Sequence, residues 1–226
     1  MDPRDAKDTF YEQFARVAQA VASPKRIELL DLLAQGERSV QTLARRSAQS
    51  VANASAHLQV LREARLVTAR RSGRRIYYRI ADPAVSRLVA DLRGLAERRL
   101  PELREAAHAY FGDPPALEPL DREALLARER EGSILLLDVR PGDEFDAGHL
   151  PSARSIPLGE LEQRLAEIPP DREVVAYCRG PYCVLAKQAV DLLRTHGYPA
   201  RRLSDGVPEW RAEGLPVEAA GVHEQA

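Results

Sequence analysis

The chain has 226 residues, enough for one large domain or two ordinary ones, and its 44% apolar and 30% charged residues exclude general disorder. Residues 1–112 carry 20 Lys and Arg against 13 Asp and Glu, whereas residues 113–226 carry 13 against 21. Net charges of +7 and −8 predict two domains with different partners, and the basic half is the candidate for nucleic acid.

The order of the residues excludes two further classes of protein. No stretch reaches the roughly 18 apolar residues of a membrane-spanning helix, and the start of the sequence, MDPRDAKDTFYEQF, lacks the apolar core of a secretion signal. The two cysteines, Cys178 and Cys183, are too few for a disulfide framework or an all-cysteine zinc site. We therefore expect no membrane association, and reduced thiols in the cytoplasm.

The first half predicts helices followed by one hairpin. Apolar residues recur at helical spacing, and Ser23 and Pro24 provide a cap and a first residue for the second helix. The predicted helices cover residues 9–22, 24–35, 39–47, 50–64 and 83 to about 110. In the fourth of these, the stripe expected to face the core consists of Val51, Ala54, Leu58 and Leu61.

The predicted hairpin spans residues 66–80, where apolar and polar side chains alternate around Ser72 and Gly73. Residues 62–79 hold seven arginines and one acid, Glu63, and four of the arginines bracket the turn. Most charge runs are simply solvated surface. Here the charge coincides with a short helix, a longer helix and a hairpin, the order of a winged helix-turn-helix, so DNA binding is the better interpretation.

The segments ASPKRIELLDLLAQGERSVQTLARRS and ASAHLQVLREARLVTARRSGRRIYYRIADP resemble the ArsR family of bacterial transcriptional repressors over about residues 10–105. The resemblance implies a homodimer formed by the first and last helices, bound to double-stranded operator DNA. It implies a recognition helix over residues 50–61 and a wing over 67–80. By position, the groove-facing residues would be Ser50, Asn53, Ser55 and Gln59, and the backbone-facing residues Arg70, Arg71, Arg74 and Arg75.

Metal sensing of the kind known in that family is not expected. Its members use cysteines in the helix that corresponds to residues 25–34, and KRIELLDLLA has none. Asp91 and His108 are available on the last helix, but they are seventeen residues apart and are more simply explained as solvated side chains. We therefore expect neither a metal nor a cofactor.

The second half predicts an α/β domain. Residues 112–119, GDPPALEP, interrupt the pattern, and buried strands are then expected at 134–138 and 174–177, with a helix over 184–197 and a strand near 200–203. The predicted fold is a mainly α winged helix-turn-helix followed by an α/β domain with a parallel sheet. The predicted boundaries are 1–111, a linker at 112–117, a second domain at 118–220 and a tail at 221–226.

The loop CRGPYC follows the second buried strand and precedes a helix, so backbone N–H groups should point towards Cys178. Together with Arg179 they favour a thiolate on that residue. A buried, inert cysteine is the alternative. The remaining loop residues are Gly180, Pro181 and Tyr182, and the glycine and proline form a tight turn that favours an anion-binding site beside a reactive sulfur.

Three motifs resemble the rhodanese family of sulfurtransferases over about residues 117–218: LLDVRPGDEFDAGHLPSARSIPL, YCRGPYCVLA and LSDGVPEWRAEGLPV. The resemblance implies that Cys178 takes a sulfane sulfur from a donor, forms a persulfide and passes the sulfur to an acceptor thiol. Arg179 and Cys183 complete the candidate catalytic set. Asp138 and Arg140 match the family's DVR motif and His149 its GH motif, which implies that they mainly support the fold and the loop. Trp210 matches the tryptophan near the end of the domain, which implies a place in the core.

Spacing within the loop separates this reading from related phosphatases, which carry an arginine six residues after the cysteine, where this chain has Val184. Cys183 occupies the position where many rhodaneses have a basic residue. It could resolve sulfur received by Cys178, through a direct or sulfur-extended bridge, or merely fill the first turn of the next helix.

Two functions follow from these features. The first is a DNA-binding regulator, a probable repressor, whose rhodanese domain senses or transfers reactive sulfur. The second is a sulfurtransferase whose helical half serves only for dimerisation. The arginine-rich hairpin favours the first.

Overall fold

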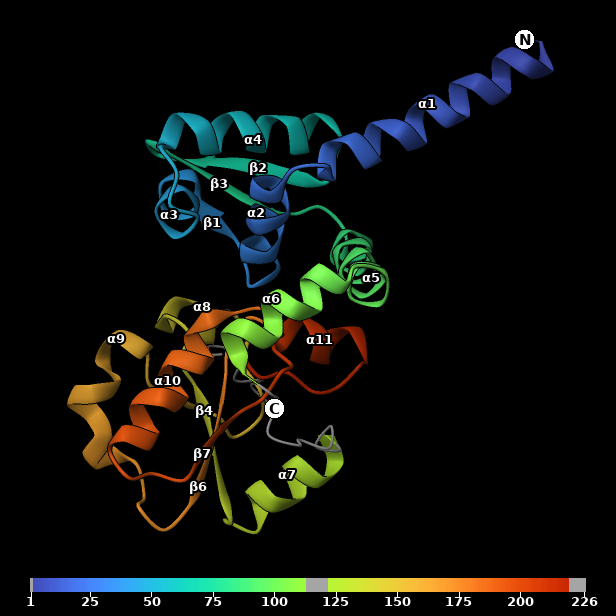
Figure 1. Ribbon diagram of the computed structural model, residues 1–226. Coiled ribbons are helices and arrows are strands. Elements are labelled where there is room, and N and C mark those ends of the chain that lie inside the picture. The colour runs from blue at the N-terminus through green and yellow to red at the C-terminus, as the bar shows by residue number, and fades with distance from the viewer. Residues whose placement is uncertain (1, 113–121, 220–226) are drawn as a thin grey trace, which may run out of the picture. The chain divides into compact units, whose positions relative to one another are not determined.

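In the computed structural model, which describes residues 2–112 and 122–219, the chain begins with helix α1, Pro3–Val21 (Figure 1). The Asp2 carboxylate caps this helix by accepting the Arg4 backbone N–H at 2.7 Å, and Pro3 occupies its first position. The helix therefore starts six residues earlier than the apolar pattern predicts, because its first turns are polar and stabilised by the cap.

The helix-turn-helix follows as predicted. Ser39 caps α3 by accepting the Thr42 N–H at 3.2 Å, and Ser50 caps α4 by accepting the Asn53 N–H at 3.1 Å. Their apolar stripes pack with α1 and α2 into one core of buried leucines, valines and alanines. The helices are α2 (Pro24–Ala34), α3 (Val40–Arg46) and α4 (Val51–Glu63).

The prediction that Val51 belongs to the core stripe is wrong, because this residue is 47% exposed. It is the first residue of α4 and lies about 50° from the centre of the line formed by Ala54, Leu58 and Leu61, given 3.6 residues per turn. Those three residues are fully buried. The surface at the start of α4 is therefore more apolar than expected.

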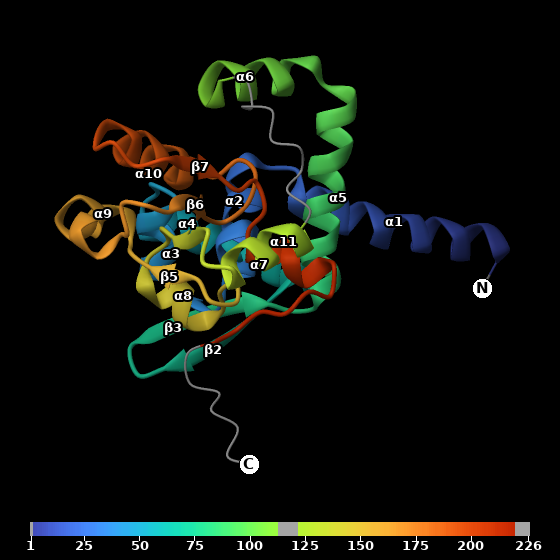
Figure 2. The same cartoon turned by 90° about the horizontal axis from the view of Figure 1, so that it is seen from below.

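The hairpin consists of β2 (Val67–Ser72) and β3 (Arg75–Ile80), and β1 (Arg38–Ser39) pairs with the other side of β3. All pairs are antiparallel. The two turn residues are Gly73 and Arg74, with Gly73 at a φ of +58°. Figure 2 shows the two strands running side by side to this turn. The turn lies one residue later than predicted, so Arg74 occupies the tip itself.

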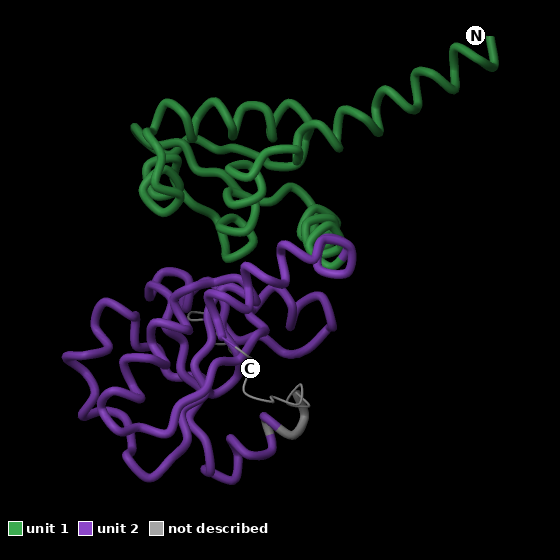
Figure 3. The backbone as a smooth tube through the Cα atoms, viewed as in Figure 1, with its two compact units in different colours: residues 1–94 green, residues 95–226 purple. Residues whose placement is uncertain are grey.

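The single long helix predicted from residue 83 is wrong, because the chain forms α5 (Pro83–Arg99) and α6 (Pro101–Phe111). The break falls at Leu100, which has an extended backbone with φ −109° and ψ 100°. Pro101 causes it, since a proline ring disfavours the helical conformation of the residue before it. The two compact units divide at residues 94 and 95, within α5 (Figure 3).

The second unit contains a four-stranded parallel sheet in the order β5-β4-β6-β7, which confirms the predicted α/β fold class. The predicted linker at 112–117 and tail at 221–226 fall almost entirely outside the described residues. The elements are α7 (Arg122–Arg130), β4 (Ile134–Asp138), α8 (Gly142–Ala147), β5 (Arg154–Ser155), α9 (Leu158–Leu161), the 3₁₀ helix η1 (Glu162–Glu167), β6 (Glu173–Tyr177), α10 (Val184–Thr195), β7 (Ala200–Arg202) and α11 (Val207–Ala212).

The strand register places the candidate loop at one edge of this sheet. Asp138 lies opposite Tyr177, the residue before Cys178, and Ala176 lies opposite Arg202. Because the strands are parallel, the segments after β4, β6 and β7 leave the sheet on the same side. Buried apolar residues form two clusters in this unit, so the sheet provides a rigid base for those segments.

Candidate functional site

The predicted groove-facing residues of α4 differ in how far they are exposed to solvent. Asn53 is exposed, whereas Ser55 and Gln59 are half-buried. The Ser50 hydroxyl already serves as the helix cap. Sequence reasoning placed Val51 in the core, yet its side chain is exposed at the start of α4.

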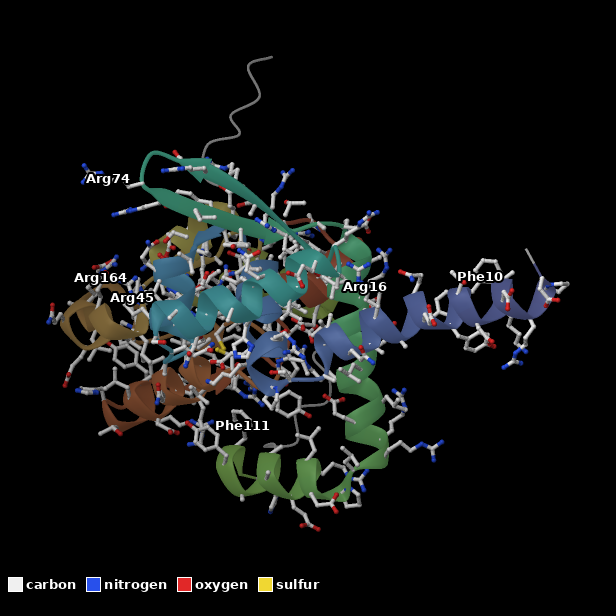
Figure 4. The ribbon with its side chains drawn as sticks, turned by 90° about the horizontal axis from the view of Figure 1, so that it is seen from above. Phe10, Arg16, Arg45, Arg74, Phe111 and Arg164 are labelled. Carbon is white, nitrogen blue, oxygen red and sulfur yellow. The ribbon has the colours of Figure 1, made fainter. Side chains whose placement is uncertain are left out.

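All four predicted backbone-facing arginines, Arg70, Arg71, Arg74 and Arg75, are exposed on the hairpin, and Figure 4 shows Arg74 at its turn. Arg70 is held differently. Its Nε lies 2.8 and 2.9 Å from the two carboxylate oxygens of Glu37, and its guanidinium lies over the Tyr77 ring at 4.9 Å. The Glu37 carboxylate therefore balances the charge of Arg70, which lowers the pKa of Glu37.

The cysteine loop is built from two backbone segments in close contact. Cys178 is buried at the end of β6, and its thiol donates to the carbonyl oxygen of Cys183 at 3.5 Å. Gly180 has a φ of +133°, which favours glycine. A Cβ on Gly206 would lie only 2.6 Å from the Cys178 carbonyl oxygen. Glycine is therefore required at both positions to form the loop.

The two thiols interact, and their surroundings shift the two pKa values in opposite directions. Burial raises the pKa of Cys178. The pKa of Cys183 is lowered to about 6, because the Cys178 thiol donates a hydrogen bond to it and backbone N–H groups of Arg179 and Leu185 point to its sulfur. Loss of the first proton from this pair is therefore favoured at Cys183.

Arg179 does not act on the sulfurs as an unpaired cation. Its Nε and Nη2 each lie 2.9 Å from a carboxylate oxygen of Glu144, a fully buried residue of α8. This bidentate pair fixes the guanidinium beside the loop and balances most of its charge. Sequence reasoning missed Glu144 because it lies 35 residues away within the motif DEFDAGH.

The residues expected to support the loop lie in a buried network. The Arg140 Nε donates to Asp138 at 3.0 Å, and its Nη2 donates to the Gly148 carbonyl oxygen at 2.7 Å. Tyr177 accepts the Leu150 N–H at 3.0 Å, and burial raises the pKa of its hydroxyl. These contacts join the ends of β4 and β6 to the segment after α8.

His149 packs beside that network. Its ring stacks on Phe145 with centroids 3.6 Å apart, and its Nδ1 lies 2.9 Å from the Phe145 carbonyl oxygen. Trp210 is fully buried in the neighbouring apolar cluster.

Two further contacts bind the middle of the loop. The Tyr182 hydroxyl donates to Glu97 of α5 at 2.9 Å, and the Pro181 carbonyl oxygen accepts from Arg202 Nη1 at 2.7 Å. Neither partner was predicted, because both are distant in sequence and neither belongs to a recognisable motif. Among the described residues, no group of three or more His, Cys, Asp or Glu is arranged to hold a metal, and no described helix is long and apolar enough to cross a bilayer.

Two family models match the chain: the bacterial regulatory protein, arsR family, over residues 23–69, and the rhodanese-like domain over residues 121–213. The HTH-type transcriptional regulator Rv0324 of Mycobacterium tuberculosis is 46% identical over 95% of this chain and 94% of its own length. The chain belongs to the ArsR family of transcriptional regulators. It is a member with a C-terminal rhodanese-like domain.

Two further proteins each match less than half of this ArsR-family regulator. A protein named sulfurtransferase from Allochromatium vinosum is 35% identical over 44% of this chain and 94% of its own length. The solution structure of a homodimeric winged helix-turn-helix DNA-binding domain from Mycobacterium bovis is 44% identical, with a TM-score of 0.40, and covers 44% of this chain and 90% of that chain.

The lowered pKa of Cys183 gives the regulator a testable pH profile. A thiol whose pKa is lowered keeps its thiolate above that pKa and loses it as the pH falls through it. We expect alkylation of Cys183 by iodoacetamide to inflect near pH 6, the pKa of about 6 in the folded protein, whereas an ordinary cysteine inflects at about 8.5. Trypsin cleaves after Arg179, so separate peptides report the two cysteines.

The urea-unfolded chain is the control for this measurement, because both of its cysteines should inflect at about 8.5. If the folded protein gives the same curve as the unfolded chain, the loop does not lower the pKa of either thiol.

Proposed function

We propose that this ArsR-family regulator is a homodimeric, cytoplasmic repressor whose rhodanese-like domain senses sulfane sulfur as a persulfide on Cys178. The observation that carries the proposal is a pair of thiol residues in contact, one of them with a lowered pKa, in the same chain as a winged helix with exposed arginines. The thiols supply the chemistry of a sulfur sensor, and the arginines supply the contacts to DNA.

A second copy of the chain would cover the apolar residues left exposed on α1 and α5. Phe10 and Phe14 are 59% and 66% exposed, and Figure 4 shows Phe10 on the free part of α1. Aromatic and leucine side chains in such numbers are typical of an interface. The exposed apolar residues of the two helices are Phe10, Tyr11, Phe14, Leu88, Leu92 and Leu95.

The sulfur chemistry requires only the loop. As a donor such as thiosulfate arrives, the Cys183 thiolate accepts the Cys178 proton, and the Cys178 sulfur attacks the outer sulfur of the donor. A new S–S bond forms, the donor's S–S bond breaks, and sulfite leaves with the electron pair. An acceptor thiolate then removes the outer sulfur and releases Cys178 as a thiolate. Cys178 is placed first in this sequence because it holds the first position of the rhodanese-like loop.

One helix offers a route from the loop to the DNA-binding half. Tyr182 is bound to Glu97, near the end of α5, whereas Val85 and Val89 at the start of α5 are buried in the winged-helix core. A change in the position of Tyr182 would therefore act on a helix that contributes to both units. This continuity supports a regulatory use of the sulfur chemistry over an independent one.

Mass spectrometry of the polysulfide-treated protein tests the proposal. We expect an added mass of ~32 Da, one sulfur, on the peptide of residues 173–179, which holds Cys178. Cys178→Ser should lose it because an alcohol is a poor nucleophile, whereas Cys183→Ser should retain it. If the sulfur is found first on residues 180–187, the roles of the two cysteines are reversed.

The competing function is a sulfurtransferase that does not bind DNA, which the similarity of the second half to a named sulfurtransferase favours. A gel shift on the DNA upstream of the protein's own gene and a thiosulfate turnover assay separate the two. Turnover without a shift at low salt would support the sulfurtransferase, whereas a specific shift supports the regulator.

A further inference from the structure

Arg202, the last residue of β7, lies against the cysteine loop although it is 19 residues beyond Cys183. Its Nη1 donates to the Pro181 carbonyl oxygen at 2.7 Å. Its guanidinium also lies over the ring of Phe111, 4.3 Å from the centroid. These two contacts fix a half-buried cation beside the turn that joins the two thiols.

The charge of Arg202 is not balanced by a carboxylate among the described residues, which distinguishes it from its neighbours. Arg140 pairs with Asp138, and Arg179 pairs with Glu144. The residue beside it, Arg201, pairs with Glu173. The contacts of Arg202 are instead a carbonyl oxygen and an aromatic face, which leave a full positive charge in place.

The other charges around the thiols do not provide a net positive field. Arg179 is largely neutralised by Glu144, and Glu209 of α11 lies on the Gly180 side of the loop, within about 3 Å of where a Cβ of that glycine would be. Burial lowers the pKa of Arg202, and the two cysteines act on it in the opposite direction. A negative charge on Cys178 or Cys183 would therefore balance the charge of Arg202, which no described carboxylate balances.

We propose that Arg202 is a positioning residue of the sulfur site: it stabilises negative charge on the thiol pair and makes the site prefer anionic sulfur donors, such as thiosulfate, over neutral ones. The preference for donors rests on the proposed function. The stabilisation of the thiolate does not, because it concerns the resting protein.

Two alkylating reagents of similar size but different charge test the proposal on the full chain. Iodoacetamide is neutral and reports the thiolate, whereas iodoacetate is an anion and also reports the local field. In Arg202→Met, which keeps an apolar group beside Phe111, we expect the pH midpoint of alkylation to rise by about one unit. The ratio of iodoacetate to iodoacetamide rates should fall severalfold at low salt. The peptides 173–179 and 180–187 assign the rates to Cys178 and Cys183.

The matched control is Arg201→Met, which removes the same charge from the same strand. Glu173 keeps a partner in that variant, because Arg128 also binds it at 2.9 Å. Arg201→Met should therefore behave as wild type in both measurements. Arg202→Lys should recover most of the rate ratio, since it restores the charge without the guanidinium geometry. Circular dichroism of each variant shows whether the fold is retained.

The outcomes separate this proposal from the proposed function. If Arg202→Met keeps the wild-type midpoint and rate ratio, or if Arg201→Met and Arg202→Met change both equally, the role of Arg202 is refuted. If Arg202→Met shows both shifts and Arg202→Lys reverses them, its role stands, even if polysulfide adds no sulfur to the wild-type loop. In that case only the sulfur-sensing function would fail.

Discussion

Replacing Arg74 and Arg75 with alanine should weaken binding to every DNA sequence by roughly tenfold or more near 0.1 M salt, because phosphate contacts provide most of the non-specific affinity. Both side chains are exposed at the hairpin turn. A twofold dimer presents four such arginines to a pseudo-palindrome with half-sites ~34 Å apart. The slope of log affinity against log salt should fall in magnitude by up to about 3.6, or ~0.9 per lost contact. Fluorescence anisotropy across a salt series measures both quantities.

Arg98→Ala/Arg99→Ala is the matched control, since it removes the same charge from exposed positions outside the hairpin. It should keep nearly the full salt slope. Asn53→Ala, on the exposed side of α4, should instead reduce the ratio of operator to random-DNA affinity and leave the slope unchanged. Affinity that does not depend on salt, or full binding by the hairpin double variant, would show that the hairpin is not the wing.

Polysulfide should change the operator affinity of the wild-type protein, by about 5- to 150-fold if the coupling is typical of allosteric proteins, and dithiothreitol should restore it. In the expected reaction, the Cys183 thiolate attacks the inner sulfur of the Cys178 persulfide. A Cys178–Cys183 bond forms and hydrosulfide leaves, so the two thiols are oxidised and the sulfane sulfur is reduced. The contact between the Cys178 thiol and the Cys183 carbonyl shows that the two residues already meet in the reduced protein.

The single variants decide between a bridge and a simple persulfide. Cys178→Ser and Cys183→Ser should both bind DNA and both fail to respond to polysulfide, because each lacks one half of the bridge. A direct disulfide requires Cα atoms within ~7 Å, and extra sulfur atoms relax that limit. A Cys183→Ser protein that responds like wild type would leave the Cys178 persulfide as the signal. If neither variant differs from wild type, the rhodanese-like domain is not the sensor.

The fold was largely predictable because it depends on local pattern. Helical spacing located α2, α3 and α4, and the apolar runs located β4 and β6. The break at Leu100 was also predictable in principle, since Pro101 is visible in the sequence. The start of α1 leaves no apolar period, but Asp2 followed by Pro3 is the same pattern of cap and proline that Ser23 and Pro24 provide for α2.

The candidate site divides in the same way. The loop CRGPYC is recognisable as a motif in the sequence. Its partners Glu144, Glu97 and Arg202 are not, because they contact the loop from separate elements and belong to no periodic pattern. The ion pair of Arg70 with Glu37 joins residues that are 33 apart in the sequence. The sequence alone therefore offered no reason to separate Arg70 from the other arginines of the hairpin. Partners brought together by tertiary structure decide which charges remain available.

The close approach of Gly206 to the Cys178 backbone limits the directions in which the loop can move. Conversion of a thiolate to a persulfide anion leaves the net charge unchanged and adds one large atom to a side chain that is 2% exposed. On the Gly206 side the loop backbone has no room to move inwards, because even a methyl-sized group on Gly206 would lie only 2.6 Å from the Cys178 carbonyl oxygen. A close-packed wall of this kind yields little, so we expect the volume of an added sulfur to be accommodated by an outward movement of residues 179–183. In the proposed sensor, the loaded and empty states would then differ by steric displacement of the loop.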